Sequence, residues 1–201
     1  MFFSSLFPPS LSLSFFHSSY SSVLPPVLKK ISFEVKGRQH VGICGRTGSG
    51  KSTLTLALYR MLEPLCGKIL IDGIDISTIG LYQLRSMLSI IPQVPTLFIG
   101  TIRSNLDPFK EYTDERIWEV LEQVQLKSFI SSLKLKLENP VSEGGSDYSV
   151  GQRQLFCFAR ALLRDSKIII MDEATSNIDF ETDQVIQETI TKLFRCLEKI
   201  K

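Results

Sequence analysis

The residues with the clearest chemical potential lie at positions 45–53, which read GRTGSGKST. They fit the pattern G-x-x-x-x-G-K-[ST], with Gly45 and Gly50 followed by Lys51 and Ser52. Such glycines let backbone N–H groups wrap a phosphate, and a helix starting at Gly50 directs its positive dipole end at the same charge. Lys51 is expected to reach the β- and γ-phosphates of a nucleotide, and the Ser52 hydroxyl to coordinate Mg²⁺.

The alternative for this stretch is a glycine-rich turn with an exposed lysine. An apolar, strand-like run precedes the loop and a helix-like run follows it, which favours phosphate binding. The residues predicted to bind the nucleotide are Gly45, Arg46, Thr47, Gly48, Ser49, Gly50, Lys51, Ser52 and Thr53.

A P-loop needs a second acid for its metal ion, and the segment IIIMDE supplies one. Four apolar residues, Ile168 to Met171, lead into Asp172 and Glu173. A carboxylate at the end of a buried strand can hold Mg²⁺ or its water, which is the expected role of Asp172. Glu173 points to the other side of the strand and can polarise an attacking water. Alone, the pattern would fit a plain strand end, but after a P-loop it indicates phosphate chemistry.

The segments that must position these residues alternate between strand and helix patterns. Apolar runs predict strands at 40–44, 67–77 (a strand-turn-strand), 87–91 and 167–172. Helix patterns begin at Lys51, at Ser149 and around Ile117, where apolar residues recur at i, i+3, i+4 and i+7. A last helical stripe runs from Ile186 to Phe194. The alternation predicts an α/β fold with a mostly parallel sheet.

Composition narrows the class of protein further. At 201 residues the chain is about one domain, and its formal net charge is +2. Lys and Arg are scattered among Asp and Glu, so no basic stripe predicts nucleic acid as a partner. The four cysteines lie far apart without a C-x-x-C pair, which favours buried or free thiols over a zinc site or disulfides.

The N-terminal residues differ from the rest, being rich in Phe, Leu, Ser and Pro and uncharged before Lys29. Pro8, Pro9 and many serines break any run long enough for a membrane span, and a basic segment typical of a signal peptide is missing. We therefore expect residues 1–19 to form an irregular, poorly packed extension. A targeting segment is the alternative.

The phrase SVGQRQL, shortly before the apolar strand with its two acids, resembles the signature of ATP-binding-cassette (ABC) proteins. Residues 20–195 resemble the second nucleotide-binding domain of subfamily C, the multidrug-resistance-associated type. Supporting phrases are LPPVLKKISF, IPQVPTLF, GTIRSNLDPF, VSEGGSDYSVGQRQLFCFARALLR and DEATSNIDFETD. The resemblance implies a P-loop core, a small antiparallel β subdomain, a helical signature subdomain and ATP hydrolysis coupled to export across a membrane.

The same resemblance assigns further site residues. Tyr20 matches the aromatic residue that stacks on adenine, although an apolar surface anchor is the alternative. Gln93 matches the glutamine that contacts Mg²⁺ and the attacking water, the alternative being a polar loop residue between two prolines. Glu173, Gln93 and Lys51 are thus the catalytic candidates, and Ser52, Gln93 and Asp172 the candidates for holding the metal. The signature residues are Ser149, Val150, Gly151 and Gln152, and the loop that couples two sites contains Ser176 and Asp179.

In this family the signature caps the γ-phosphate held by another domain, so catalysis requires a sandwich dimer with a second nucleotide-binding domain. Glu143 matches a segment that touches the transmembrane domains, which places such a domain on the cytosolic face of a membrane. The transported substrate is chosen by the membrane domains and is not encoded in this sequence.

Three features depart from the family pattern. Tyr148 stands where the commonest signature has Leu, and residues 1–19 do not resemble the strand that normally opens the domain, so one edge of the antiparallel subdomain is expected to be missing or badly formed. The family also has a histidine after the catalytic Glu, whereas the two histidines here, His17 and His40, both precede the P-loop. The chain thus reads as a C-terminally truncated domain, and hydrolysis by it alone is expected to be very low.

Two functions therefore remain open: a motor ATPase of an exporter, or a regulatory module that binds ATP without turning it over. A soluble ABC ATPase of DNA repair or translation is disfavoured by the subfamily-C phrases.

Overall fold

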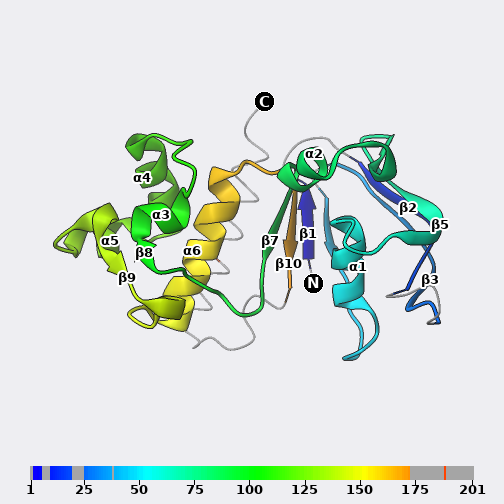
Figure 1. The fold of residues 1–201 in the computed structure, drawn as a ribbon, viewed down its shortest axis with the longest axis horizontal. Helices are drawn as coiled ribbons and strands as arrows, with labels where there is room; N and C mark the ends of the chain where they lie inside the picture. The colour runs from blue at the N-terminus through cyan, green and yellow to red at the C-terminus, as the bar shows by residue number, and fades with distance from the viewer. Residues whose placement is uncertain (1, 6–9, 20–24, 38, 173–187, 189–201) are drawn as a thin grey trace. The chain divides into compact units, whose positions relative to one another are not determined.

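A computed structural model of the chain describes residues 2–5, 10–19, 25–37, 39–172 and 188. The chain divides into two compact units, whose helices and strands are drawn in Figure 1. We call them the core unit, residues 1–90 with 166–172, and the helical unit, residues 91–165 with 173–201.

Two four-stranded sheets build the core unit, with the strand orders β4-β1-β10-β7 and β3-β2-β5-β6. In the first sheet β1 is antiparallel to both β4 and β10, so β4 and β10 run in the same direction. In the second, β2 is antiparallel to β3 and β5. The strands are β1 (Phe2–Ser5), β2 (Leu11–Ser18), β3 (Leu28–Val35), β4 (His40–Gly42), β5 (Pro64–Ile71), β6 (Ile74–Asp75), β7 (Leu88–Ile91) and β10 (Ile168–Met171). The helices are α1 (Lys51–Leu58), η1 (Ile76–Thr78) and α2 (Leu81–Ser86).

The N-terminal segment differs from the irregular extension expected from the sequence. Its described part forms β1 and β2, and β2 lies between β3 and β5 rather than leaving that antiparallel sheet incomplete. The reason is the alternation LSLS, in which Leu11 and Leu13 are buried while Ser12 and Ser14 are partly exposed; the register then shifts before Phe16, which is also buried. A two-residue period is the pattern of a half-buried strand, and its serines are compatible with that pattern.

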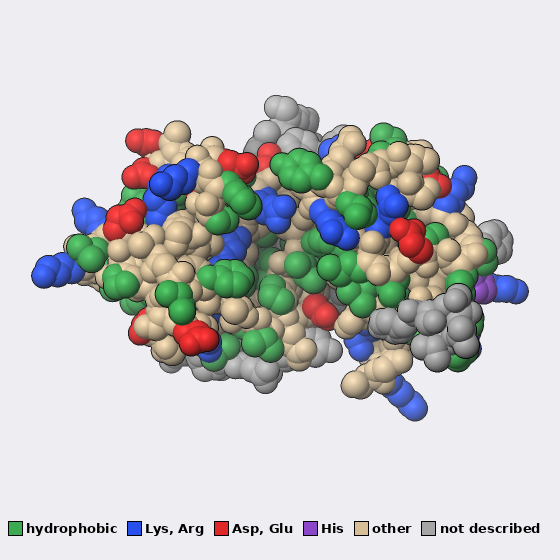
Figure 2. Space-filling view, viewed as in Figure 1, with side chains coloured by type: hydrophobic (Ala, Val, Ile, Leu, Met, Phe, Trp, Pro, Cys, Tyr) green, Lys and Arg blue, Asp and Glu red, His purple; other side chains and the backbone are tan. Residues whose placement is uncertain are grey.

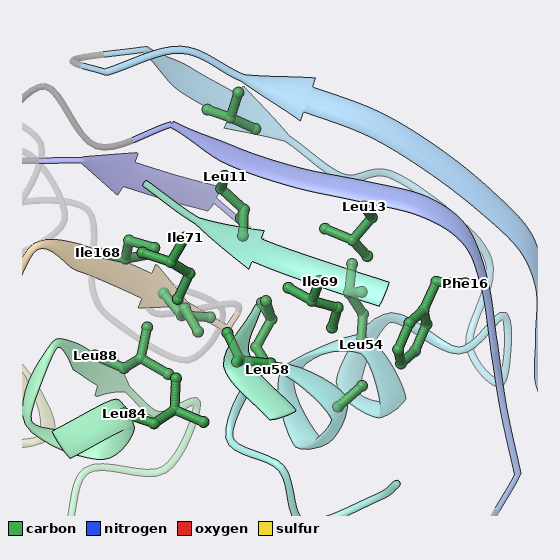
Figure 3. Packing of buried hydrophobic residues seen from close by; sticks show 14 of the residues in the cluster. Leu11, Leu13, Phe16, Leu54, Leu58, Ile69, Ile71, Leu84, Leu88 and Ile168 are labelled. Atoms are coloured by element: carbon green, nitrogen blue, oxygen red, sulfur yellow. The ribbon is translucent and has the colours of Figure 1, made fainter. Parts of the chain in front are cut away.

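The core of this unit joins both sheets to α1. Leu54 and Leu58 of α1 face Leu13 and Phe16 of β2 and Ile69 of β5 (Figure 3). Helix α1 places these residues at i and i+4, so one apolar face packs on the sheet while its N-terminal end stays free for the P-loop.

We predict that Leu58→Ala lowers the free energy of unfolding by about 3 kcal/mol, because Leu58 is fully buried and its loss leaves a cavity. Leu65→Ala is the matched control, since Leu65 is 52% exposed and should change stability by less than ~1 kcal/mol. Urea unfolding of both variants measures the difference. Equal effects would contradict this description of the core.

The helical unit is built from four α-helices and a short two-stranded ladder in its described part. Its helices are α3 (Ile102–Leu106), α4 (Asp114–Gln123), α5 (Lys127–Ser132), α6 (Val150–Leu163), η2 (Lys136–Glu138) and η3 (Glu143–Gly145). Strands β8 (Gly100–Thr101) and β9 (Pro140–Val141) pair antiparallel. The helix predicted around Ile117 is confirmed as α4, in which Ile117, Val120 and Leu121 are buried.

The sequence explains where α4 begins. The hydroxyl of Thr113 accepts a hydrogen bond from the Arg116 backbone N–H, which caps the first turn. Asp114 and Glu115 then place negative charge at the positive end of the helix dipole. The α/β class predicted from the sequence is confirmed, as are strands within 67–75, 87–91 and 167–172, whereas Ile76 and Ser77 belong to η1 and β4 ends at Gly42, earlier than predicted. The predicted mostly parallel arrangement is not shown, because β1 and β2 each run antiparallel to both of their neighbours.

The surface and thiols agree with an ordinary globular domain. Basic and acidic side chains are interspersed on the face shown in Figure 2. Among the described residues Cys44 and Cys66 are exposed, and Cys157 is buried. No helix in the described part of the chain is both long and apolar enough to cross a membrane.

Candidate functional site

The P-loop connects β4 to α1 in the core unit. Gly48 and Gly50 have φ angles of +79° and +94°, in the left-handed region that favours glycine. A Cβ on Gly50 would also lie 3.1 Å from the Leu28 side chain, which is buried beneath the loop. Glycine is therefore needed at position 50 both for backbone conformation and for space.

The loop curls around the side chain of Lys51. The Lys51 ammonium donates to the carbonyl oxygens of Gly45 and Arg46, at 2.8 and 3.3 Å. A Cβ on Gly45 would lie 2.5 Å from the Ser49 hydroxyl, so the loop is closely folded at this point. The cation is thereby held beside the start of α1, whose first turn carries no acidic residue. An anion at this helix end meets N–H groups, the helix dipole and an ammonium together.

The strand β10 brings a carboxylate to the same place. All four residues of β10 are buried, and Asp172 follows directly at its end. The Ser52 hydroxyl donates to the Asp172 carboxylate at 3.3 Å. A hydroxyl and a carboxylate oxygen are the ligand types that Mg²⁺ takes beside nucleotide phosphates, so these two residues suit that ion. The structure thus brings the Ser52 and Asp172 side chains together, and Lys51 directly precedes Ser52 in the chain.

Other predicted nucleotide-binding residues contribute differently. Arg46, Thr47, Gly48 and Ser49 are exposed in the loop, whereas the Thr53 side chain is buried in the core unit. Any contact of position 53 with phosphate would therefore come from its backbone amide.

The signature residues lie at the start of α6 in the helical unit. The Ser149 hydroxyl accepts from the Gln152 backbone N–H at 3.1 Å, and the Gln152 side chain accepts from the Ser149 N–H at 3.0 Å. This reciprocal pair is a capping box, which fixes the first turn of the helix. Val150 is exposed and Gly151 buried. Sequence reasoning assigned the Ser149 hydroxyl to a partner's phosphate; in this structure it caps its own helix.

The residues before α6 hold the signature in place. The Tyr148 ring is buried and packs edge-on against Phe129 and Phe156, with ring centroids 6.1 and 5.4 Å apart. Burial raises the pKa of the Tyr148 hydroxyl. Hydrogen bonds from the Ser142 side chain and backbone N–H lower the pKa of Asp147. The tyrosine that departs from the family signature therefore serves as a packing anchor for α6.

We predict that Ser149→Ala lowers the free energy of unfolding by about 1 kcal/mol, because it removes the acceptor of the capping box. Ser149→Thr keeps a hydroxyl at the cap and should stay within ~0.5 kcal/mol of the wild type. Chemical denaturation monitored by circular dichroism reports both values. An alanine variant as stable as the threonine variant would show that the cap does not support α6.

Several predicted residues cannot be placed in this site. Gln93 is exposed and belongs to the helical unit. Tyr20, Glu173, Ser176 and Asp179 lie outside the described residues, so their roles stay predictions.

Sequence reasoning missed a buried polar network in the helical unit. The Arg160 guanidinium donates to the backbone oxygens of Asn105 and Thr96 and to the Asn105 side chain, at 2.7 to 2.9 Å. It also lies over the Phe98 ring, 5.8 Å from its centroid. Burial lowers the pKa of Arg160. An arginine within the apolar run FCFARALL was the available signal, since a charge in such a run requires partners.

Comparison with known proteins places these features in a family. The ABC transporter family matches residues 28–176, more than half of the chain. Over 175 residues the chain is 54% identical to ABC transporter C family member 13 of Dictyostelium discoideum, 55% identical to ABC transporter C family member 7 of Arabidopsis thaliana and 54% identical to ATP-binding cassette sub-family C member 2 of Rattus norvegicus.

These alignments cover 87% of this chain but only 13%, 12% and 11% of the respective relatives, so the chain spans about an eighth of their length. The matched region includes the P-loop, the signature and Asp172. The chain belongs to the ABC transporter family and is an ATP-binding domain of subfamily C.

Proposed function

We propose that this domain binds Mg-ATP and hydrolyses it as the motor of an ABC exporter. The observation that carries the proposal is the hydrogen bond between Ser52 and Asp172, next to Lys51, whose ammonium is held by the P-loop carbonyl oxygens. A cation, a metal-binding hydroxyl and a carboxylate beside a helix N-terminus form the set that phosphoryl transfer requires.

In this proposal the P-loop amides and Lys51 bind the phosphates, while Ser52 and Asp172 hold Mg²⁺. The ion, when bound, neutralises charge on the phosphate oxygens. Gln93 would complete the metal shell, and Glu173 would accept a proton from the attacking water. These last two roles follow from the motif match and await a test.

The partners follow from what one domain lacks. The N-terminus of α6, with exposed Val150 beside Ser149, is proposed to cap the ATP of a second nucleotide-binding domain.

The segment after β7 exposes Val94, Phe98 and Ile99 by 69%, 68% and 74%. Adjacent exposed apolar side chains indicate a protein interface, and we propose that the transmembrane domains of a transporter cover them. This puts the domain at the cytosolic face of a membrane, with no role for nucleic acid.

A fluorescent ATP analogue titrated into the chain tests nucleotide binding directly. We expect saturable, Mg²⁺-strengthened binding, and weaker metal dependence in Asp172→Asn, because the neutral amide no longer attracts the cation. Absence of binding by the wild-type chain would refute the proposal.

Phosphate release tests the alternative, an ATP-binding module without turnover. We expect very low turnover by the isolated chain. Robust turnover that Glu173→Gln abolishes would reject the alternative, because the amide cannot act as a base.

A further inference from the structure

The loop that contains Gln93 is held to α6 at two points. The Gln154 side-chain amide donates from Nε2 to the Pro92 carbonyl oxygen at 3.3 Å. The Arg160 guanidinium donates to the Thr96 carbonyl oxygen at 2.9 Å. All of these residues belong to the helical unit. The span from Pro92 to Thr96 therefore has both of its ends fixed to the same helix.

Gln154 lies in an unusual environment for an amide. It is 0% exposed, and the next residues of α6, Leu155 and Phe156, are buried as well. Its Oε1 atom is buried and has no hydrogen-bond partner in the part of the chain that the structure describes. A buried acceptor without a partner costs about 1–3 kcal/mol, and an apolar side chain of the same length would avoid that cost. What the amide adds to such a side chain is its hydrogen bond to Pro92.

This hydrogen bond acts on the peptide group next to the residue that is predicted to contact the metal. Pro92 directly precedes Gln93, so the Pro92 carbonyl lies in the same planar peptide unit as the N–H and Cα of Gln93. Fixing the carbonyl oxygen fixes that plane, and with it the direction in which the Gln93 side chain leaves the backbone. Gln93 is exposed, so burial does not set its orientation.

We propose that Gln154 is a positioning residue for Gln93, which it orients through the Pro92 carbonyl. Residues that hold a metal ligand in place control metal affinity without touching the ion. Gln154 also lies on the helix whose N-cap is Ser149, so the helix that begins with the signature holds the Gln93 loop. The consequence for Mg²⁺ rests on the proposed function, whereas the position of the loop does not.

Gln154→Met tests the consequence for the metal. Methionine is of similar length and fills the same space, but it has no N–H to donate. The measured quantity is the ratio of the ATP-analogue affinities with and without Mg²⁺. We expect Gln154→Met to lower this ratio about 10-fold, as for other residues that orient a metal ligand. The control, Gln123→Met, removes an amide from the exposed last residue of α4 and should keep the ratio within ~2-fold of the wild type.

The same substitution in a Gln93→Ala background shows whether Gln154 acts through Gln93. There we expect Gln154→Met to change the ratio by less than ~2-fold, because the side chain that it positions is gone. An equal effect in both backgrounds would overturn the proposal, and so would a ratio that falls in Gln93→Ala but not in Gln154→Met. If Gln93→Ala leaves the ratio unchanged, or the wild type binds no ATP analogue, the proposed function fails instead, and the position of the loop decides this proposal.

A spin label next to Gln93 measures that position without nucleotide. Val94 is 69% exposed, so Val94→Cys can carry the label outside the core, with serine in place of every native cysteine except buried Cys157. We expect Gln154→Met to shorten the rotational correlation time of the label by at least ~2-fold, and Gln123→Met to leave it unchanged. Circular dichroism verifies that the variants are folded, and Gln154→Leu serves if the methionine variant is not. A folded variant without the amide whose spectrum matches the wild type would refute the positioning role of Gln154.

Discussion

We expect Lys51→Ala to lower the affinity of the chain for ATP by about 100-fold, which corresponds to about 3 kcal/mol. The lysine ammonium is held beside the start of α1 by the carbonyl oxygens of Gly45 and Arg46. Charge-assisted hydrogen bonds to phosphate are each worth roughly 1.5–3 kcal/mol, and alanine provides none. Fluorescence titration with an ATP analogue at fixed salt and Mg²⁺ concentrations gives the affinity.

The control for this prediction is Lys29→Ala. Lys29 is an exposed lysine on β3 of the same unit, so the variant loses the same charge from a residue outside the loop. We expect its ATP affinity to stay within ~2-fold of the wild type, because exposed charges are strongly screened by salt. Thermal unfolding shows that both variants are folded. ATP binding that survives Lys51→Ala would remove the P-loop from the proposed function.

Local sequence patterns predicted the elements whose evidence lies within one segment. The apolar spacing at Ile117, Val120 and Leu121 fixed α4, and the polar start at Ser149 fixed the beginning of α6. The four apolar residues before Asp172 indicated β10 in the same way. Each pattern arises because one face of a helix, or a whole strand, is buried. Such burial can be recognised from the apolar residues of a single stretch of sequence.

These local patterns could not predict the pairing of strands that lie far apart in the sequence. Segment 2–5 has no alternation to mark a strand, and its place between β4 and β10 depends on backbone groups of residues far along the chain. The strand β2 does carry a signal, since Leu11 and Leu13 alternate with serine, although the proline and serine content of residues 1–19 indicates irregular structure. Composition is a weaker guide than period when the polar residues are small.

The candidate site was predictable where a motif fixes chemistry and spacing. Ser52 and Asp172 are far apart in sequence, yet both were assigned to one metal, and their side chains do meet. The capping role of Ser149 was equally visible, because Gln152 follows at the spacing of a capping box. The family resemblance, in contrast, implies a phosphate ligand for the same hydroxyl.

Arg160→Ala is expected to lower the free energy of unfolding by about 3–4 kcal/mol, the largest loss of stability that we predict for a polar residue. The guanidinium joins α6 to Asn105 at the end of α3 and to Thr96, and Asn105 in turn bonds both backbone groups of Phe98. Its removal leaves the carbonyl oxygen of buried Asn105 and that of Thr96 without their donor. Lysine cannot reproduce three planar N–H contacts, so Arg160→Lys should recover at most about half of the loss.

The same network explains how the exposed segment that contains Phe98 is held. Phe98 is 68% exposed, yet its backbone is bonded through Asn105 to Arg160 and its ring lies beside the guanidinium. Arg160→Ala should therefore speed chymotrypsin cleavage after Phe98 as well as shift the urea midpoint. Arg116→Ala is the control, because its ion pair with Glu119 is exposed and should contribute less than ~0.5 kcal/mol. If the two variants lost equal stability, the Arg160 network would not hold the exposed segment that contains Phe98. The proposed contact of that segment with membrane domains would then rest on its exposed apolar side chains alone.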